Sequence, residues 1–295
     1  MRILLTGGSG DLGRLLSEAL AAGGDEPAVI DPAPPHPCVK THFASSLLDR
    51  AAVARSVEGV DCVVHVAAWH GIHEARGMKT VYDFHDLNVT GTFEVLEASA
   101  RAGVRRFVFI SSTSASDRYG VYGHTKLLGE EMARAYAHRH GMGVIILWPR
   151  AFILSWNRAV YTSFPEWGAW YARGAVHIAD VCRAVLCAVD LLQKEGGLPT
   201  PAPVFTIDGA YEFTKEDLDG WDAEGPGSTF RKYYPDDEGL MRRYGLDPAR
   251  KPKVLDIPDA EKLPGYTPQY SLKNMLGELR RFDAGRMGDA NRAES

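Results

Sequence analysis

The chain has 295 residues, of which 45% are hydrophobic and 24% are charged, and its formal net charge is −5. This composition can supply the core of one large α/β domain or of a domain with a cap, and it excludes a disordered chain. The slightly acidic balance, without a block of Lys or Arg, argues against nucleic acid as a partner.

The beginning of the chain predicts a strand, a glycine turn and a helix. The apolar run 2–6 leads into Gly7, Gly10 and Gly13 and then into a helical stretch, 14–22. Glycines at these places let the backbone turn tightly, approach a pyrophosphate and pack the helix on the strand. The spacing is G-x-x-G-x-x-G, not the commoner G-x-G-x-x-G, so a plain glycine turn that caps a helix is the alternative.

A second apolar run, 28–30, ends in Asp31, eighteen residues after Gly13. An acidic side chain at this distance suits the ribose 2′-hydroxyl of a dinucleotide and repels a 2′-phosphate. The sequence therefore favours NAD over NADP. The proline-rich segment that follows, 32–37, is interpreted as a surface connector.

Further apolar runs lie at 61–66, 104–110 and 143–148 and alternate with helical stretches. Strands that alternate with helices predict a doubly wound α/β fold, in which helices cover both faces of a parallel sheet. His70 and His73, which follow the first of these runs, have no obvious carboxylate or cysteine partner. We interpret them as part of a polar loop and expect no metal site.

Tyr122 and Lys126 stand one helical turn apart, ten residues after Ser112. Because residues i and i+4 share a helix face, Lys126 could hold its ammonium near a Tyr122 phenolate and lower the tyrosine pKa from about 10. The Ser112 hydroxyl could then align a substrate alcohol. The pattern Tyr-x-x-x-Lys is weak by itself, and its weight comes from the motifs around it.

The composition changes after Pro149. Residues 150–175 are rich in aromatic side chains and contain Arg150, Arg158 and Arg173. We expect most of this cluster to form the core of a small domain or a subunit contact. The alternative is a pocket lining, in which aromatic faces stack on a sugar or base and an arginine grips a carboxylate or phosphate. Arg150 and Arg173 are the candidates for that contact.

A predicted helix over 178–192 and a predicted strand over 204–207 return the chain to the sheet. The predicted division is a Rossmann domain from 1–149 and 176–208, a smaller C-terminal substrate domain from 150–175 and 209–283, and a polar, disordered tail from 284–295.

These motifs together resemble the extended short-chain dehydrogenase/reductase family, of the NAD-dependent epimerase/dehydratase type. The matching segments cover most of the chain and follow one another in the family's order: 6–13, 59–68, 88–98, 104–113, 122–126, 176–184 and 263–272. The resemblance implies a Rossmann fold, NAD as the cofactor and hydride transfer as the chemistry.

The resemblance also implies roles for individual residues. Ser112, Tyr122 and Lys126 would be catalytic, and Asn88 would support a water or backbone link behind the lysine. The residues expected to bind NAD are Gly7, Gly10, Asp11, Leu12, Gly13, Asp31, Ala67, Ala68, Asn88, Tyr122, Lys126 and Pro149. The residues expected to bind substrate are Trp69, Ser112, Thr113, Arg150 and Arg173.

The expected reaction is hydride transfer at a secondary alcohol or ketone of a sugar, a sugar acid or a similar polyol. Tyr122 stands only ten positions after Ser112, whereas sugar-nucleotide members of the family carry a longer loop, so a smaller substrate is favoured. The segment 114–117 lacks the Asp-Glu pair of the family's dehydratases. An epimerase that retains NAD and forms a keto intermediate is the alternative, and a cofactor-sensing regulator is disfavoured by the intact Tyr122 and Lys126.

Two departures from the family pattern affect the cofactor. Ser46 stands where an aspartate is expected to contact the adenine, and Trp148 stands where many members have arginine. The resemblance further predicts a homodimer that pairs through helices at 88–102 and 122–140.

The four cysteines have unrelated spacings, which predicts reduced thiols rather than disulfides or metal ligands. The N-terminus carries no export signal, and no apolar run approaches the roughly 18 residues of a membrane span. We therefore expect a cytoplasmic protein that binds a small-molecule substrate and no membrane.

Overall fold

The computed structural model describes the chain except for residues 117, 119, 156, 158–159, 195–201 and 287–295. The chain divides into two compact units. Unit 1 consists of Met1–Arg150, Val181–Ile207 and Ile257–Tyr266, and unit 2 consists of Ala151–Asp180, Asp208–Asp256 and Thr267–Ser295. Arg158 and most of the predicted disordered tail lie outside the described residues.

Unit 1 is built on a seven-stranded sheet in which each strand runs parallel to its neighbours. In the order in which they pair, the strands are β3 (Thr41–Phe43), β2 (Glu26–Ile30), β1 (Arg2–Thr6), β4 (Cys62–His65), β5 (Arg106–Ile110), β6 (Gly143–Pro149) and β7 (Val204–Ile207). This confirms the predicted doubly wound α/β fold.

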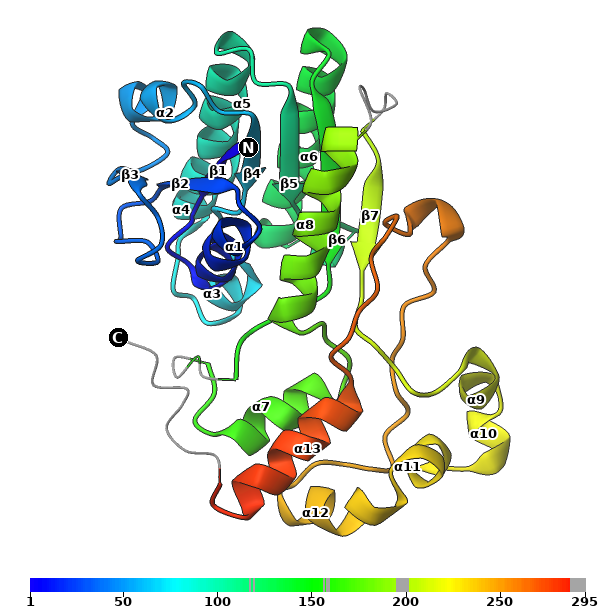
Figure 1. Cartoon of the computed structure of the whole chain (residues 1–295). Coiled ribbons are helices and arrows are strands. Elements are labelled where there is room, and N and C mark those ends of the chain that lie inside the picture. The colour runs from blue at the N-terminus through cyan, green and yellow to red at the C-terminus, as the bar shows by residue number, and fades with distance from the viewer. Residues whose placement is uncertain (117, 119, 156, 158–159, 195–201, 287–295) are drawn as a thin grey trace. The chain divides into compact units, whose positions relative to one another are not determined.

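Helices cover both faces of this sheet (Figure 1). The main ones are α1 (Asp11–Ala22), α2 (Arg50–Ser56), α5 (Thr92–Arg101), α6 (Val121–His140) and α8 (Ile178–Lys194). The central strands β4 and β5 are buried along most of their length, as expected of parallel strands covered on both sides. Side chains of α2, α5 and α6 pack with these strands in the core of unit 1.

The strand register brings the carboxyl ends of the central strands to one edge of the sheet. Thr6, the last residue of β1, pairs with Ile30 at the end of β2 and with His65 at the end of β4. Ile110 and Leu147 pair in the same way between β5 and β6. Ligands of doubly wound sheets bind beyond this edge, and most of the predicted site residues of unit 1 follow it.

The structure corrects three expectations about elements. Strand β3 was not predicted, because it has only three residues and all are half-buried. The helix expected over 88–98 is divided into a π-helical segment, His85–Gly91, and α5. The expected polar loop at His70 and His73 is instead a short helix, α3 (Gly71–Ala75), because the side chain of His73 accepts a hydrogen bond from the His70 N–H at 3.0 Å.

Residues 257–266, which the sequence assigns to the smaller domain, are part of unit 1. This segment contains a 3-10 turn, Asp259–Glu261. The Thr206 hydroxyl of β7 donates a hydrogen bond to the Glu261 carboxylate at 3.1 Å. This contact joins the segment to the edge strand of the sheet.

Unit 2 is helical in its described residues. Its helices are α7 (Phe164–Tyr171), α9 (Lys215–Asp219), α10 (Trp221–Glu224), α11 (Ser228–Tyr233), α12 (Glu238–Arg243) and α13 (Leu272–Asp283). Aromatic rings form much of its core, for example Trp167 stacked on Tyr171 with centroids 5.0 Å apart. Across the described residues of both units, no helix is long and apolar enough to cross a membrane.

Candidate active site

Three glycines at the turn between β1 and α1 have no room for a side chain. Gly7 has a left-handed backbone, with φ of 67°, and a Cβ there would lie 2.7 Å from the Cα of Ala67. A Cβ on Gly13 would lie 2.4 Å from the Cα of Gly8. A Cβ on Gly8 would lie 2.5 Å from a methyl group of Val29. Gly8 is therefore a further required glycine, which the motif spacing did not single out.

Gly10 differs from these glycines because nothing crowds it. A Cβ there would meet only the Gly7 carbonyl, at 3.4 Å. Gly10 is also the N-cap of α1, and no described side chain caps this helix. The first N–H groups of α1 are thus available to a phosphate, and a dinucleotide backbone could approach Gly10 closely. The neighbouring Leu12 side chain is buried, so only its main chain can take part.

Asp31 follows β2 at the edge of the sheet, beside the glycine turn. Its carboxylate accepts hydrogen bonds from the N–H groups of Ala33, at 2.8 Å, and Ser9, at 3.3 Å. Arg14 lies at the same edge and donates to the carbonyls of Ser9 and Pro34, each at 3.0 Å. The acidic side chain that favours NAD is therefore held in place, with one arginine near it.

Ser112, Tyr122 and Lys126 are brought together after β5. Ser112 lies near the Tyr122 phenol, whose pKa its hydroxyl lowers. The Lys126 ammonium is buried, lies 6.0 Å from the centre of the tyrosine ring and donates to the Ile110 carbonyl at 2.8 Å. Thr113, the next hydroxyl, is half-buried at the start of a 3-10 turn, Thr113–Ser116. Asp117 lies outside the described residues.

The electrostatics of this group correct one expectation. Burial raises the pKa of Tyr122 to about 12, and the nearby Ser112 hydroxyl only opposes this rise. Burial likewise lowers the pKa of Lys126 to about 7, against the opposing charge of Glu130. The lowered tyrosine pKa expected from Lys126 is absent, because the surroundings penalise both charges and the ammonium is directed at the Ile110 carbonyl.

Glu130 was missed by the sequence reasoning. It lies one turn beyond Lys126 on α6 and is fully buried. Its carboxylate accepts hydrogen bonds from the Ser111 hydroxyl, from Trp148 Nε1 at 2.6 Å and from Arg134 at 3.1 Å. From the sequence, Trp148 was noted only as a departure from the family pattern. In the structure it binds the Glu130 carboxylate, whose negative charge acts on Lys126. The sequence did offer one indication of this interaction, because Lys126 and Glu130 are four residues apart and therefore share a helix face.

Asn88 lies buried in the π-helical segment and joins two parts of the site. Its side chain accepts from the N–H of Trp69 at 2.8 Å and donates to the Trp69 carbonyl at 2.9 Å. It also donates to the Thr125 hydroxyl at 3.1 Å. Asn88 therefore links the segment after β4 to the turn of α6 that carries Lys126.

A second carboxylate that the sequence reasoning missed, Glu74, holds the start of α6. It accepts hydrogen bonds from the N–H groups of Val121, at 2.7 Å, and Tyr122, at 2.8 Å. No sequence signal connects Glu74 to Tyr122, because the contact joins residues 48 positions apart.

The other predicted site residues are distributed over both units. In unit 1, Ala67 and Ala68 follow β4, and Pro149 is the last residue of β6. The Lys79 ammonium lies over the Trp69 ring, 4.0 Å from its centre. Arg150 closes the first segment of unit 1, with its side chain buried. Arg173 belongs to unit 2. The two arginines proposed for one contact thus lie in different units.

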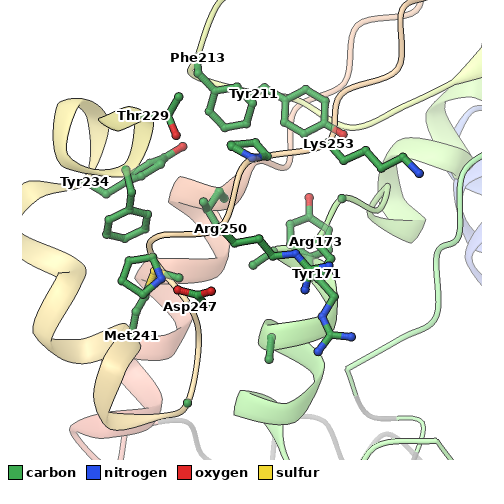
Figure 2. Close-up of a pocket in the computed structure, with 18 residues that line it drawn as sticks. Tyr171, Arg173, Tyr211, Phe213, Thr229, Tyr234, Met241, Asp247, Arg250 and Lys253 are labelled. Carbon is green, nitrogen blue, oxygen red and sulfur yellow. The ribbon is translucent and has the colours of Figure 1, made fainter. Parts of the chain in front are cut away.

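Unit 2 contains a pocket of its own, shown in Figure 2. Aromatic side chains from separate segments line it, among them Tyr171, Tyr211 and Phe213. Arg173, Arg250 and Lys253 also line it, and all three are exposed. The pocket combines aromatic surface with three cations and one carboxylate, Asp247, and this net positive charge suits an anionic ligand with a ring. Of its cations, the sequence reasoning identified only Arg173.

Residues 3–197 match the model of the NAD dependent epimerase/dehydratase family. Uronate dehydrogenase of Pseudomonas putida is 31% identical over 165 residues, which cover 49% of this chain and 58% of the relative. Uronate dehydrogenase of Pseudomonas syringae pv. tomato is 32% identical over 183 residues, which cover 56% of this chain and 60% of the relative. The chain therefore spans only 58% and 60% of the lengths of these relatives.

Solved structures share the fold at low identity. MoeE5, in complex with UDP-glucuronic acid and NAD, superposes with a TM-score of 0.68 at 20% identity and covers 96% of this chain and 100% of its own. UDP-glucuronic acid 4-epimerase from Bacillus cereus, in complex with UDP-glucuronic acid and NAD, has a TM-score of 0.69 at 19% identity, with coverage of 96% and 99%.

Proposed function

Because the chain belongs to the NAD dependent epimerase/dehydratase family, we propose that it is an NAD-dependent oxidoreductase that transfers a hydride at a secondary alcohol of a sugar or sugar acid. The observation that carries this proposal is the grouping of Tyr122 with Ser112, whose hydroxyl lowers the tyrosine pKa, and with the buried Lys126, whose ammonium lies 6.0 Å from the centre of the tyrosine ring. These residues follow the same edge of the sheet as the glycine turn and Asp31.

The residues of this edge fit NAD. The open position at Gly10 and the N-terminus of α1 would hold the pyrophosphate, and Asp31 would accept hydrogen bonds from the adenosine ribose. Tyr122 and Lys126 would contact the nicotinamide ribose, as in the family, with Asn88 and Pro149 beside them. NAD, when bound, supplies the hydride acceptor.

The protein supplies the proton chemistry. Ser112 orients the substrate oxygen, and Tyr122 takes the proton of the alcohol or returns it to the ketone. A phenol with a pKa of about 12 is protonated at neutral pH, which is the state that serves reduction. Oxidation needs the phenolate, which a charged Lys126 would stabilise; burial lowers the Lys126 pKa to about 7, and the Glu130 carboxylate opposes this and so favours the cation.

A uronic acid is the substrate class that we favour. Two of the relatives named above are uronate dehydrogenases. The cations of the unit 2 pocket suit a carboxylate, and the nine residues between Ser112 and Tyr122 leave little chain for a loop that touches a nucleotide. As parts of the same proposal, we assign NAD binding and the contact with the reacting oxygen of the substrate to unit 1, and further substrate contacts to unit 2.

The test is a screen of the purified chain with NAD against uronic acids, neutral aldoses and nucleotide sugars, with both NADH and the sugar products quantified. A dehydrogenase accumulates NADH in proportion to the oxidised sugar. An epimerase instead interconverts two sugars, keeps its cofactor bound and accumulates no NADH. Binding of NAD without turnover of any substrate in the panel would contradict the proposal and favour a cofactor-sensing regulator.

A homodimer belongs to this proposal as well. The helices concerned, α5 and α6, lie side by side in unit 1 (Figure 1). Phe93 on α5 is 40% exposed and packs edge to face on Tyr136 of α6, with ring centroids 6.5 Å apart. Such a surface gains stability when a second copy covers it. A monomer in sedimentation equilibrium at micromolar concentration would refute this part.

We also place the protein in the cytoplasm. The support is the state of the cysteines, which are free thiols in the structure. Burial raises the pKa of Cys62 to about 12, which keeps this thiol protonated and unreactive. Localisation of a tagged chain by fractionation tests this assignment.

A further inference from the structure

The helix that carries Tyr122 cannot cap its own N-terminus. Tyr122 is the second residue of α6, and the N-cap position is Gly120, which has no side chain. The first N–H groups of any α-helix lack partners within the helix. Where no local side chain satisfies them, the first turn frays unless another element supplies an acceptor.

Glu74 of α3 supplies that acceptor from outside the helix. One carboxylate oxygen accepts from the Val121 N–H at 2.7 Å, and the other accepts from the Tyr122 N–H at 2.8 Å. Hydrogen bonds from backbone N–H groups to a carboxylate are charge-assisted, and a negative charge at a helix N-terminus is favourable. The main chain of Tyr122 is therefore fixed by Glu74.

The same short helix also limits the tyrosine ring. A Cβ on Gly71 would lie 3.3 Å from Cδ1 of Tyr122, which is closer than side chains normally pack. Because position 71 is glycine, the ring can lie against α3. The segment is itself anchored, since Asn88 holds both main-chain polar groups of the adjacent Trp69, at 2.8 and 2.9 Å.

We propose that Glu74 is a positioning residue for the reaction, which fixes the Tyr122 hydroxyl opposite Ser112 by holding the first turn of α6. The inference rests on the proposed role of Tyr122 and deepens it. A group that acts only through the geometry of another should lower the rate of the chemical step and leave the affinity for NAD unchanged, because small misplacements of a reacting group cost much rate.

The variants are Glu74→Ala, which removes both acceptors, and Glu74→Gln, which keeps one acceptor oxygen. The matched control is Asp49→Ala, because Asp49 caps α2 through the Ala52 N–H at 3.1 Å and takes no part in the proposed site. Gly71→Ala tests the ring contact, with Gly239→Ala, where a Cβ would meet nothing within 4 Å, as its control.

The kinetic readout is kcat, the dissociation constant of NADH and the primary isotope effect with substrate deuterated at the reacting carbon. We expect Glu74→Ala to lower kcat about tenfold or more, with an increased isotope effect and unchanged NADH affinity. Glu74→Gln should fall between it and the wild type. Gly71→Ala should lower kcat in the same way, and both control variants should keep the kcat of the wild type.

Equal losses of thermal stability in Glu74→Ala and Asp49→Ala, with kcat retained in both, would show that Glu74 is a purely structural cap and would overturn the proposal.

Hydrogen exchange of the peptide that contains Val121 and Tyr122 provides a readout that needs no substrate. We expect faster exchange of these two amides in Glu74→Ala than in the wild type, and no change in Asp49→Ala. Unchanged exchange would overturn the positioning role even if the wild type turned over no substrate. Inactivity of the wild type, by contrast, would count against the proposed function alone.

Discussion

Tyr122 is the side chain through which the proposed reaction moves its proton. Tyr122→Phe keeps the ring, and thus the contact with Gly71, and removes only the hydroxyl. We expect kcat to fall by about 10²–10⁴, the usual contribution of general acid–base catalysis. Calorimetry should show that the variant still binds NAD, weakened by no more than the loss of the one contact between the hydroxyl and the nicotinamide ribose. A fall of less than about threefold would contradict the assignment, since general catalysis contributes far more.

Asp31 is the residue that decides between NAD and NADP. Replacement by Asn removes the charge but leaves an acceptor for the Ala33 N–H, whereas replacement by Ser removes both. We expect each variant to raise KM for NAD about tenfold, because a hydrogen bond to a charged group contributes about 1.5–3 kcal/mol. The NADP to NAD ratio of kcat/KM should rise in both, since the carboxylate no longer repels a 2′-phosphate and Arg14 lies nearby. An unchanged ratio would assign the selectivity to another group.

In the turn between β1 and α1, we expect Gly13 to be needed for folding and Gly10 to be needed for NAD binding. Gly13→Ala places a methyl group 2.4 Å from the Cα of Gly8, and overpacking of this kind costs about 1–3 kcal/mol of stability. Gly10→Ala meets only a carbonyl at 3.4 Å, so it should fold normally and bind NAD more weakly. Urea unfolding and NAD titration of both variants measure the difference. Similar stability losses in the two would contradict the distinction.

Strand β4 ends in a buried histidine that makes the stability of unit 1 depend on pH. His65 bonds to the hydroxyls of Thr6 at 2.7 Å and Thr92 at 2.9 Å, and burial lowers its pKa to about 3. The unfolded chain, with an ordinary pKa of about 6.5, therefore takes up this proton first as the pH falls. The free energy of unfolding should decrease below pH 6.5 by up to about 1.4 kcal/mol per pH unit.

The variant that checks this pH dependence is His65→Gln, which cannot be protonated there. Denaturant unfolding of wild type and variant should give different slopes between about pH 6.5 and 5, where most carboxylates stay ionised. Parallel slopes would show that His65 is not the group responsible.

At the scale of the whole molecule, the two units should respond differently to NAD. A ligand that binds only the folded state stabilises it by mass action, by about 2.7 kcal/mol at 100 times its dissociation constant. We expect hydrogen exchange in β1, β2 and α1 of unit 1 to slow accordingly, and exchange in α11 and α12 of unit 2 to change less. Equal slowing throughout both units would contradict the assignment of NAD to unit 1.

The family, the parallel sheet and the glycine turn could be predicted because their signals are local. Gly7, Gly10 and Gly13 recur at a spacing that can be recognised within one β-α turn, and Asp31 follows the next strand directly. Short apolar runs that alternate with helical stretches similarly predict six of the seven strands of unit 1. β3 was missed because three half-buried residues carry no such pattern.

The sequence by itself thus determined the fold and the chemical group around Tyr122, because strand spacing, glycine positions and the i, i+4 pair on α6 are properties of neighbouring residues. Only the tertiary structure revealed what holds that group. Glu74 reaches α6 across 48 positions, Trp148 of β6 binds Glu130 of α6, and the unit 2 pocket brings Arg173 together with the distant segment that carries Arg250 and Lys253. Such contacts depend on how the chain folds back on itself, so no local pattern in the sequence specifies them. The raised pKa of Tyr122 has the same origin, because burial is set by the packing of all the surrounding elements.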